Sequence, residues 1–205
     1  MPDNHYLVPE QQQGLHKHME YTIITGNSED AEDCFVDAKE RLLDVNNWNK
    51  FTAINGGAFR LKDTHGREIS RHARKGDHIR IDIPGNNSQG DGYDWVAIEA
   101  IEYDDYPDVD IETFAMRMRP CISPVNRGDE EIADSRSNGA TSTFVIERRG
   151  KRLVTAYYGR NEGGDMETSV IYNTLNSAWL GLSDAQWASL IAGILEPGQS
   201  MAVKR

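Results

Sequence analysis

The sequence predicts an α+β domain in which antiparallel strands are joined by hairpins and followed by a C-terminal helix. Two stretches, 78–103 and 141–162, show strand periodicity on both sides of a turn. A third stretch, 184–196, carries apolar residues at helical spacing. An N-terminal strand and helix before these hairpins complete a pattern that is typical of α+β folds.

The stretch 78–103 carries the clearest hairpin signal in the chain. Ile79, Ile81 and Ile83 alternate with polar residues, which is the period of a strand with one buried face. Pro84 and Gly85 then end the strand, because proline cannot donate to a ladder and glycine admits positive φ. We expect the polar stretch 86–92 to be an exposed loop.

The second strand of this hairpin is apolar at both sets of alternate positions. A strand with both faces covered has this pattern. Strict alternation assigns Trp95, Glu99 and Ile101 to one face, and we expect that face to meet whatever Trp187 covers. Glu99 is then either the hydrated end of the face or a carboxylate inside a pocket. The first reading is the commoner one, because unpaired buried carboxylates are rare.

The N-terminal part of the chain predicts an arm, a strand and a helix. Residues 1–19 are polar and should form a flexible arm, followed by a β-branched strand at 20–25. Asn27 or Ser28 offers an N-cap, and acidic residues follow in the first turns. The helix after it has an apolar stripe that comprises Phe35, Val36, Leu42 and Leu43.

The middle of the chain predicts further strands separated by loops. A strand begins near 58–62, and 112–121 alternates between apolar residues and a face that carries Arg117 and Arg119. The acidic stretch 104–110 lacks the ligand spacing of a calcium loop, so we interpret it as a solvated loop. Residues 122–139 have no periodicity and predict a long loop. The strands 141–148 and 152–162 form a second hairpin about Gly150.

Two helices are expected at the C-terminal end. Apolar residues at helical spacing predict one over 166–180. Ser183 and Gln186 then form a capping box before a second helix, which ends at Pro197. Its apolar stripe, the most regular in the chain, comprises Trp187, Leu190, Ile191, Ile194 and Leu195.

Length and charge narrow the class of protein. The 205 residues are enough for one large domain, and 22 Lys+Arg against 33 Asp+Glu give a net charge of −11. Nucleic acid and membrane surfaces repel such a chain, so we expect neither as a partner. The chain also lacks an apolar run of the about 18 residues that a membrane span needs.

The cysteines and histidines predict no metal site. Cys34 and Cys121 lie far apart in the sequence and indicate free thiols in a reducing cytoplasm. The start of the chain lacks the apolar core of a signal peptide, which also favours a cytoplasmic protein. His5, His16 and His18 belong to the polar arm, where solvated imidazoles are commoner than metal ligands.

The order of elements resembles the helix-grip fold of the START-like (SRPBCC) superfamily, which includes polyketide cyclase-like and chaperone-ATPase-activator-like proteins. Trp48 follows the N-terminal helix, and Trp187 opens a C-terminal helix with leucines at helical spacing, as in these families. The resemblance covers most of residues 20–196, with an arm before and a tail at 197–205. It implies a curved antiparallel sheet of about seven strands around the C-terminal helix. The alternative fold is a β-sandwich or lipocalin-like barrel with added helices.

This resemblance implies a cavity between the sheet and the last helix, and binding more often than catalysis. We therefore expect the chain to bind a hydrophobic or aromatic small molecule, without a cofactor, as a monomer or homodimer. The expected lining residues are Trp48, Trp95, Glu99, Ile101, Arg117, Tyr157, Trp187 and Ile191, with Arg119 and Arg160 as further polar candidates. If side chains fill this space, the hypothesis of a ligand in this cavity fails.

Two other functions stay open. The first is an enzyme of the polyketide cyclase, aromatase or hydrolase type, which would need an acid or base with a shifted pKa in the pocket. Glu99 is the leading candidate for that role, ahead of His72 and His78. The second is a protein-interaction domain that uses the acidic surface and the 122–139 loop. No catalytic motif of a known class separates these alternatives.

Overall fold

The computed structural model describes residues 5–50, 58–82, 93–121, 123–125, 139–162 and 184–197. Its strands are β1 (Leu15–Ile24), β2 (Ala58–Lys62), β3 (His78–Asp82), β4 (Asp94–Tyr106), β5 (Ile111–Cys121), β6 (Thr141–Arg149) and β7 (Arg152–Glu162). Its helices are α1 (Ser28–Leu43) and α4 (Asp184–Leu195), with short 3-10 helices η2 (Val45–Lys50) and η3 (Pro107–Val109).

The strands form one antiparallel sheet of seven in the order β1-β7-β6-β5-β4-β3-β2. Each neighbouring pair from β2 to β7 follows directly in the sequence, whereas β1 joins the far edge beside β7. The chain therefore crosses from one edge of the sheet to the other between β1 and β2, and α1 lies on this crossing. The seven-stranded sheet with its C-terminal helix confirms the predicted α+β, helix-grip architecture.

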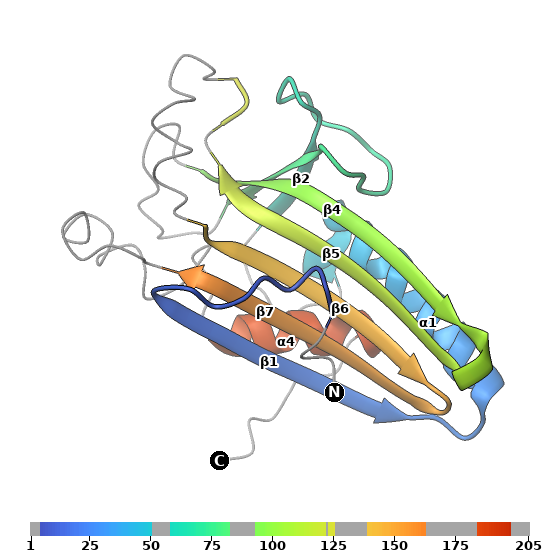
Figure 1. The fold of residues 1–205 in the computed structure, drawn as a ribbon. Coiled ribbons are helices and arrows are strands. Elements are labelled where there is room, and N and C mark those ends of the chain that lie inside the picture. Colours follow the sequence, from blue (N-terminus) through green and yellow to red (C-terminus); the bar gives the residue numbers. More distant parts are fainter. Residues whose placement is uncertain are drawn as a thin grey trace.

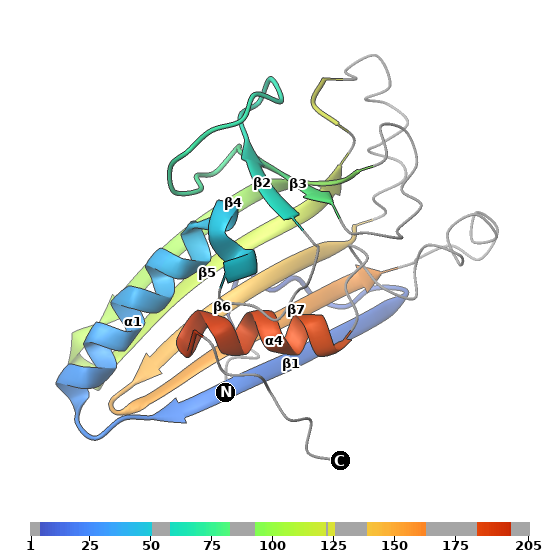
Figure 2. The same ribbon diagram turned by 180° about the vertical axis from the view of Figure 1, so that it is seen from behind.

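The two faces of the sheet carry different covers. Helices α1 and α4 both lie across one face, which we call the inner face (Figure 2). Residues 5–14 cross the opposite, outer face in front of β6 and β7 (Figure 1). The main core lies on the inner face, and a smaller cluster around Leu7 lies on the outer face. The prediction that β4 is covered on both faces is therefore confirmed, since Ile98 belongs to the first cluster and Ala100 to the second.

Helix α1 begins where the sequence indicates. Asn27 is its N-cap and accepts a hydrogen bond from the Asp30 backbone N–H at 2.8 Å. Ala31, Phe35, Ala38 and Leu42 are buried on the sheet side. Val36, which the predicted stripe included, is 49% exposed, because the buried face follows the i, i+4, i+7 positions from Ala31.

The N-terminal segment differs from the prediction. Strand β1 begins at Leu15 rather than at Glu20, so the mixed stretch 15–19 lies along β7 instead of belonging to an arm. An edge strand with one hydrated face accepts such residues, which is why composition alone misplaces its start. Leu7 is buried on the outer face, and Val8 packs against the same cluster.

Several predicted features lie outside the described residues. They are the Pro84–Gly85 turn with the loop at 86–92, most of the 122–139 loop, the helix at 166–180, the Ser183 cap and the tail beyond Pro197.

Candidate functional site

An aromatic cluster fills the middle of the inner face. Trp187 of α4 stacks on Tyr157 of β7, with ring centroids 4.2 Å apart and an interplanar angle of 20°. Phe144 of β6 lies 5.5 Å from Tyr157 and 6.0 Å from Trp187 by ring centroids. All three side chains are at most 1% exposed. The described side chains therefore occupy the space directly between α4 and these two strands, so the preformed cavity expected there is filled, and a ligand could reach these rings only by displacing one of them.

Local sequence patterns bring these rings together. Phe144 and Tyr157 are directly opposite in the β6–β7 register, so they leave the sheet on the same face as neighbours. Trp187 heads the buried stripe of α4, which packs on β1 and β7. The contact between Trp187 and Tyr157 thus joins a helix and a strand whose patterns can each be recognised in the sequence.

Trp48 and Phe59 extend the cluster toward the β2 edge. The Trp48 ring lies 5.2 Å from Phe59 and 5.7 Å from Phe144. Its Nε1 donates to the Leu42 carbonyl at 3.1 Å, at the C-terminal end of α1. This hydrogen bond satisfies the buried indole N–H and fixes the ring orientation.

The inner face also buries hydroxyl groups. Ser142 Oγ and Tyr157 OH lie 2.8 Å apart and hydrogen-bond to each other. Thr155 Oγ1 is buried, and no hydrogen-bond partner for it occurs among the described residues. A buried polar atom without a partner costs about 1–3 kcal/mol. The cluster can thus offer a ligand aromatic surface and a few hydroxyls.

Five of the eight predicted lining residues lie in or against this inner core. Trp48, Tyr157, Trp187 and Ile191 belong to it, and Ile101 packs against it. Trp95, Glu99 and Arg117 do not, since their neighbours Val96, Ile98, Met116 and Met118 take the inner positions. Whether any of the eight contacts a ligand remains a prediction.

A β-bulge in β4 divides the predicted face. Ile98 pairs with Met118 and Ala100 with Arg117, so Glu99 is the extra residue. The bulge shifts the alternation by one position. Ile101 therefore points toward the helices, whereas Trp95 and Glu99 lie on the outer face. The prediction that Trp95, Glu99 and Ile101 share a face is wrong for this reason.

Glu99 is bound by two arginines on the outer face. Arg117 Nε donates to one carboxylate oxygen at 3.0 Å, and Arg119 Nε to the other at 2.5 Å. The three side chains are each about one quarter to one third exposed. Glu99 therefore lies across the sheet from the aromatic cluster, in a position that does not suit an acid or base for a ligand there.

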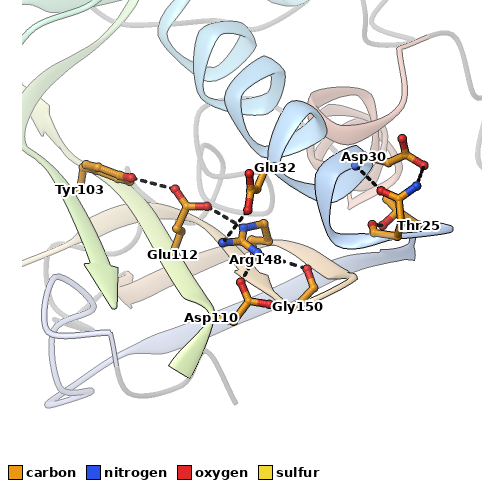
Figure 3. Close-up of polar contacts among 9 residues, drawn as sticks. Thr25, Asp30, Glu32, Tyr103, Asp110, Glu112, Arg148 and Gly150 are labelled. Carbon is orange, nitrogen blue, oxygen red and sulfur yellow. Dashed lines mark hydrogen bonds and ion pairs between the residues drawn. The ribbon is translucent and has the colours of Figure 1, made fainter. Parts of the chain in front are cut away.

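A second polar group, which the sequence did not predict, closes one end of the inner face. Figure 3 shows Arg148 of β6 between Asp110, Glu112 and Glu32 of α1. Its Nε donates to Glu112 and its Nη1 to Asp110, both at 2.6 Å. Glu112 also accepts a hydrogen bond from Tyr103 OH at 2.7 Å.

The Arg148 group joins three elements of the fold. Burial alone would lower the pKa of Arg148, but its hydrogen bonds to Asp110 and Glu112 raise it above the usual value. The hydrogen bond to Glu112 raises the pKa of Tyr103 to about 12. These groups hold the β4–β5 turn, the end of β6 and the start of α1 together, and they lie apart from the aromatic cluster. The sequence signal that could have revealed this group is the spacing of Asp110 and Glu112 next to an arginine on the neighbouring strand.

No group of three His, Cys, Asp or Glu side chains within the described ranges is arranged to hold a metal ion. Of the N-terminal histidines, His18 stacks on Tyr158 with ring centroids 4.6 Å apart, and His5 accepts a hydrogen bond from the Leu7 backbone N–H. In the part of the chain that the structure describes, no helix has both the length and the apolarity to cross a bilayer.

Comparison with known proteins gives a distant likeness of fold. No protein-family model and no curated protein matches the chain. Truncated norcoclaurine synthase from Thalictrum flavum is similar over 91% of this chain and 96% of that chain, with 10% identity and a TM-score of 0.40. A Staphylococcus epidermidis protein solved by NMR is similar over 92% of this chain and 90% of its own, with 10% identity and a TM-score of 0.40.

A Rhizobium loti crystal structure matches over 82% of this chain and 94% of that chain, with 16% identity and a TM-score of 0.29. Identities and TM-scores this low carry no argument about a ligand or an activity. The helix-grip arrangement of this chain is therefore described by its own strand order, register and C-terminal helix.

Proposed function

We propose that the chain binds a hydrophobic or aromatic small molecule against the inner-face aromatic cluster, in the manner of a START-like binding protein. The observation that supports this most is the Tyr157–Trp187 stack beside the buried Ser142–Tyr157 hydroxyl pair. Binding sites for such ligands combine apolar and aromatic walls with a few polar groups. This cluster offers both kinds of group, and its side chains carry no acid or base that would favour a reaction.

The ligand enters by displacing the Trp187 ring from Tyr157. Trp187 lies in the first turn of α4, where Lys17 Nζ contacts Asp184 at 2.7 Å. Asp184 is 77% exposed, and exposed ion pairs contribute only about 0–1 kcal/mol. An aromatic ligand replaces the ring contact that the indole gives up, so the exchange costs little aromatic contact energy.

The other end of α4 is held more firmly. Arg41 Nη1 donates to the Ile194 and Leu195 carbonyls at 2.9 and 3.2 Å. Tyr21 donates to the Glu196 carboxylate, and this hydrogen bond raises the pKa of Tyr21 to about 12. The helix therefore opens at its N-terminal end, beside Trp187, and remains attached at its C-terminal end.

The test is a titration with N-phenyl-1-naphthylamine, a neutral aromatic probe whose fluorescence rises on burial and which accepts energy from tryptophan. We expect binding, and an affinity loss of about tenfold or more in Tyr157→Leu. Tyr158→Leu is the matched control, because it changes a buried tyrosine one position along on the outer face. Its affinity should stay within about twofold of the parent. Equal losses in both variants, or no loss in Tyr157→Leu, would overturn the proposal.

A second variant tests entry beside Trp187 through a gain of affinity, read together with an unchanged urea unfolding midpoint because exposed apolar surface also binds such probes. Asp184→Asn weakens the Lys17 contact at the start of α4. If displacement of Trp187 limits binding, the affinity for the probe should rise by about two- to threefold. An unchanged or lower affinity would contradict entry at this end of the helix.

A further inference from the structure

The outer face contains a pocket that the inner-face proposal does not use. It lies between the N-terminal segment and the β1–β7 edge and has a volume of about 360 Å³. Its lining comprises Val8, Pro9, Glu10, Gln11, His16 and Arg160. Figure 1 shows the N-terminal segment crossing this side of the sheet, opposite α4. The pocket is therefore separated from the aromatic cluster by the sheet itself.

One buried residue, Asn161, holds the wall of this pocket in place. Its Oδ1 accepts hydrogen bonds from the backbone N–H groups of Gln12 and Gln13 at 2.7 and 3.3 Å. Its Nδ2 donates to the carbonyl of Glu10 at 3.3 Å, and its backbone N–H donates to Gln11 Oε1 at 3.0 Å. These bonds fasten residues 10–13 to the end of β7.

Asn161 does this in a left-handed conformation, with φ of 57°. This conformation costs roughly 1–2 kcal/mol for most residues and less for asparagine. Such backbone strain persists only where surrounding contacts fix it, and it gathers at functional sites. The residue before it in the chain is Arg160, which lines the pocket, so the same contacts also position that arginine.

Arg160 is oriented but not neutralised. Its guanidinium carbon lies 5.1 Å from the centroid of the Tyr158 ring, and its Nη1 donates to the Gly159 and Lys17 carbonyls at 3.1 and 3.4 Å. Within the described residues, Arg160 forms no ion pair, and its Nε and Nη2 make no hydrogen bond. These two groups form the fork that binds a carboxylate through two parallel hydrogen bonds.

Glu10 lines the same pocket with the opposite charge. Its carboxylate forms no ion pair with a described residue, so Glu10 and Arg160 share a pocket without pairing. Val8 and Pro9 add apolar surface beside them. A ligand with one charge would use one of the two groups and face repulsion from the other. A small zwitterion with an apolar side chain satisfies both charges.

We infer that this pocket is a second binding site, specific for a small zwitterion such as a free α-amino acid. Arg160 receives the carboxylate, Glu10 receives the ammonium group, and the Val8–Pro9 surface contacts the side chain. Asn161 is a positioning residue that shapes the wall. The inference is independent of ligand binding on the inner face.

The experiment is an NMR titration of the full chain with L-leucine and its two one-charge analogues. 4-Methylpentanoic acid lacks the ammonium group, and 3-methylbutylamine lacks the carboxylate. We expect leucine to shift the backbone amides of residues 10–16 and 160–161, with each analogue binding at least about tenfold more weakly. An analogue that binds as tightly as leucine would overturn the zwitterion assignment. Leucine that shifts no amide in these ranges would overturn the site.

Variants separate the two charges. Arg160→Gln and Glu10→Gln should each weaken leucine binding by about tenfold, while Arg160→Lys should recover only part of it because lysine lacks the fork. Arg152→Gln is the matched control, since it removes a guanidinium from the same strand, far from the pocket. Its affinity should equal that of the parent. If Arg160→Gln retains a folded spectrum and full affinity, or Arg152→Gln loses affinity equally, the inference is wrong.

Discussion

The two faces of the sheet are built from the same strands but are covered differently. On the inner face, Phe144, Tyr157 and Trp187 form one continuous aromatic core beneath two helices. On the outer face, Leu7 and Val8 cover a smaller cluster of mostly small residues and Tyr158, while Glu99 and its arginines stay partly exposed. The inner face should therefore supply most of the folding energy, and the outer face leaves polar groups accessible to solutes.

Neighbouring positions on β6 give the most direct measure of this difference. Phe144 faces the helices and Val145 faces Leu7, and both are at most 1% exposed. Phe144→Ala should lower the free energy of unfolding by about 3–5 kcal/mol, through lost burial and a cavity. Val145→Ala should lower it by about 1.5–2.5 kcal/mol. Urea unfolding followed by circular dichroism measures both, and equal losses would show that the outer cluster stabilises the fold as much as the inner one.

Arg148 tests whether charges stabilise the inner face as well. Arg148→Met removes a side chain that is 5% exposed and leaves Glu112 and Asp110 close together without their shared cation. We expect a loss of about 2–4 kcal/mol, somewhat less than for fully buried pairs because Asp110 is half exposed. Arg60→Met is the control, since its contact with Glu68 is 3.9 Å long and exposed. It should change stability by less than about 1 kcal/mol in the same urea experiment.

Glu99 tests the outer face and should have a smaller effect. Glu99→Gln removes one charge from a partly exposed ion pair with Arg117 and Arg119, so stability should fall by about 0.5–1 kcal/mol. Because the residue lies across the sheet from the aromatic cluster, binding of N-phenyl-1-naphthylamine should be unchanged. A tenfold loss of probe affinity in this variant would restore Glu99 as a residue of the inner site.

Most of the sheet was predictable because its periodicity is local. The β6–β7 hairpin, the inner face of β5 and the buried stripe of α4 follow directly from alternation and helical spacing. Their meeting at Tyr157 and Trp187 depends on the strand order, which one sequence does not specify. The helix-grip resemblance provided that order, and it led to the prediction that these two residues lie together.

The bulge at Glu99 explains the main failure at the candidate site. Strand β4 has apolar residues at both odd and even positions, and this pattern has two interpretations. Either the strand alternates strictly and both of its faces are covered, or it has one apolar face and an extra residue shifts the alternation partway along. The structure contains both features, since Val96, Ile98 and Ile101 all face inward across the shift while Ala100 packs under Leu7. A single extra residue carries no compositional signal, so strict alternation placed Trp95 and Glu99 on the same face as Ile101. Arg117 lies on the outer face for another reason, since the alternation of β5 turns Met116 and Met118 inward.

The outer pocket was missed because a polar segment was interpreted as an arm. Glu10, Gln11 and His16 have no periodicity that marks them as packed residues. Residues 10–13 are held by hydrogen bonds to Asn161, which lies 148 to 151 positions further along the chain, and His16 belongs to the edge strand β1. Long-range polar contacts of this kind leave no pattern in a local window, in contrast to the helical and strand stripes of the inner face.

The contact of the N-terminal segment with the outer face should also depend on pH, with the smallest effect of those considered. His5 Nδ1 accepts a hydrogen bond from the Leu7 backbone N–H at 3.2 Å, which requires a neutral imidazole. Burial lowers the pKa of His5 from 6.5, although the nearby Asp104, Glu102 and Glu147 carboxylates act to raise it. The folded segment therefore favours the neutral form. The stability that the neutral His5 contributes is present above pH 6.5. It is lost as the pH falls below that value and through the folded-state pKa of His5.

Hydrogen exchange at the Leu7 amide measures this loss. Its protection factor should fall by about two- to tenfold between about pH 7 and pH 5, while that of the Phe144 amide in β6 stays constant. His5→Gln should remove the pH dependence at Leu7, because glutamine does not titrate in this range. His65→Gln, a change in an exposed turn, should leave it intact. If the Leu7 and Phe144 amides lose protection together, the whole sheet responds to acid, and the outer cover is no weaker than the inner one.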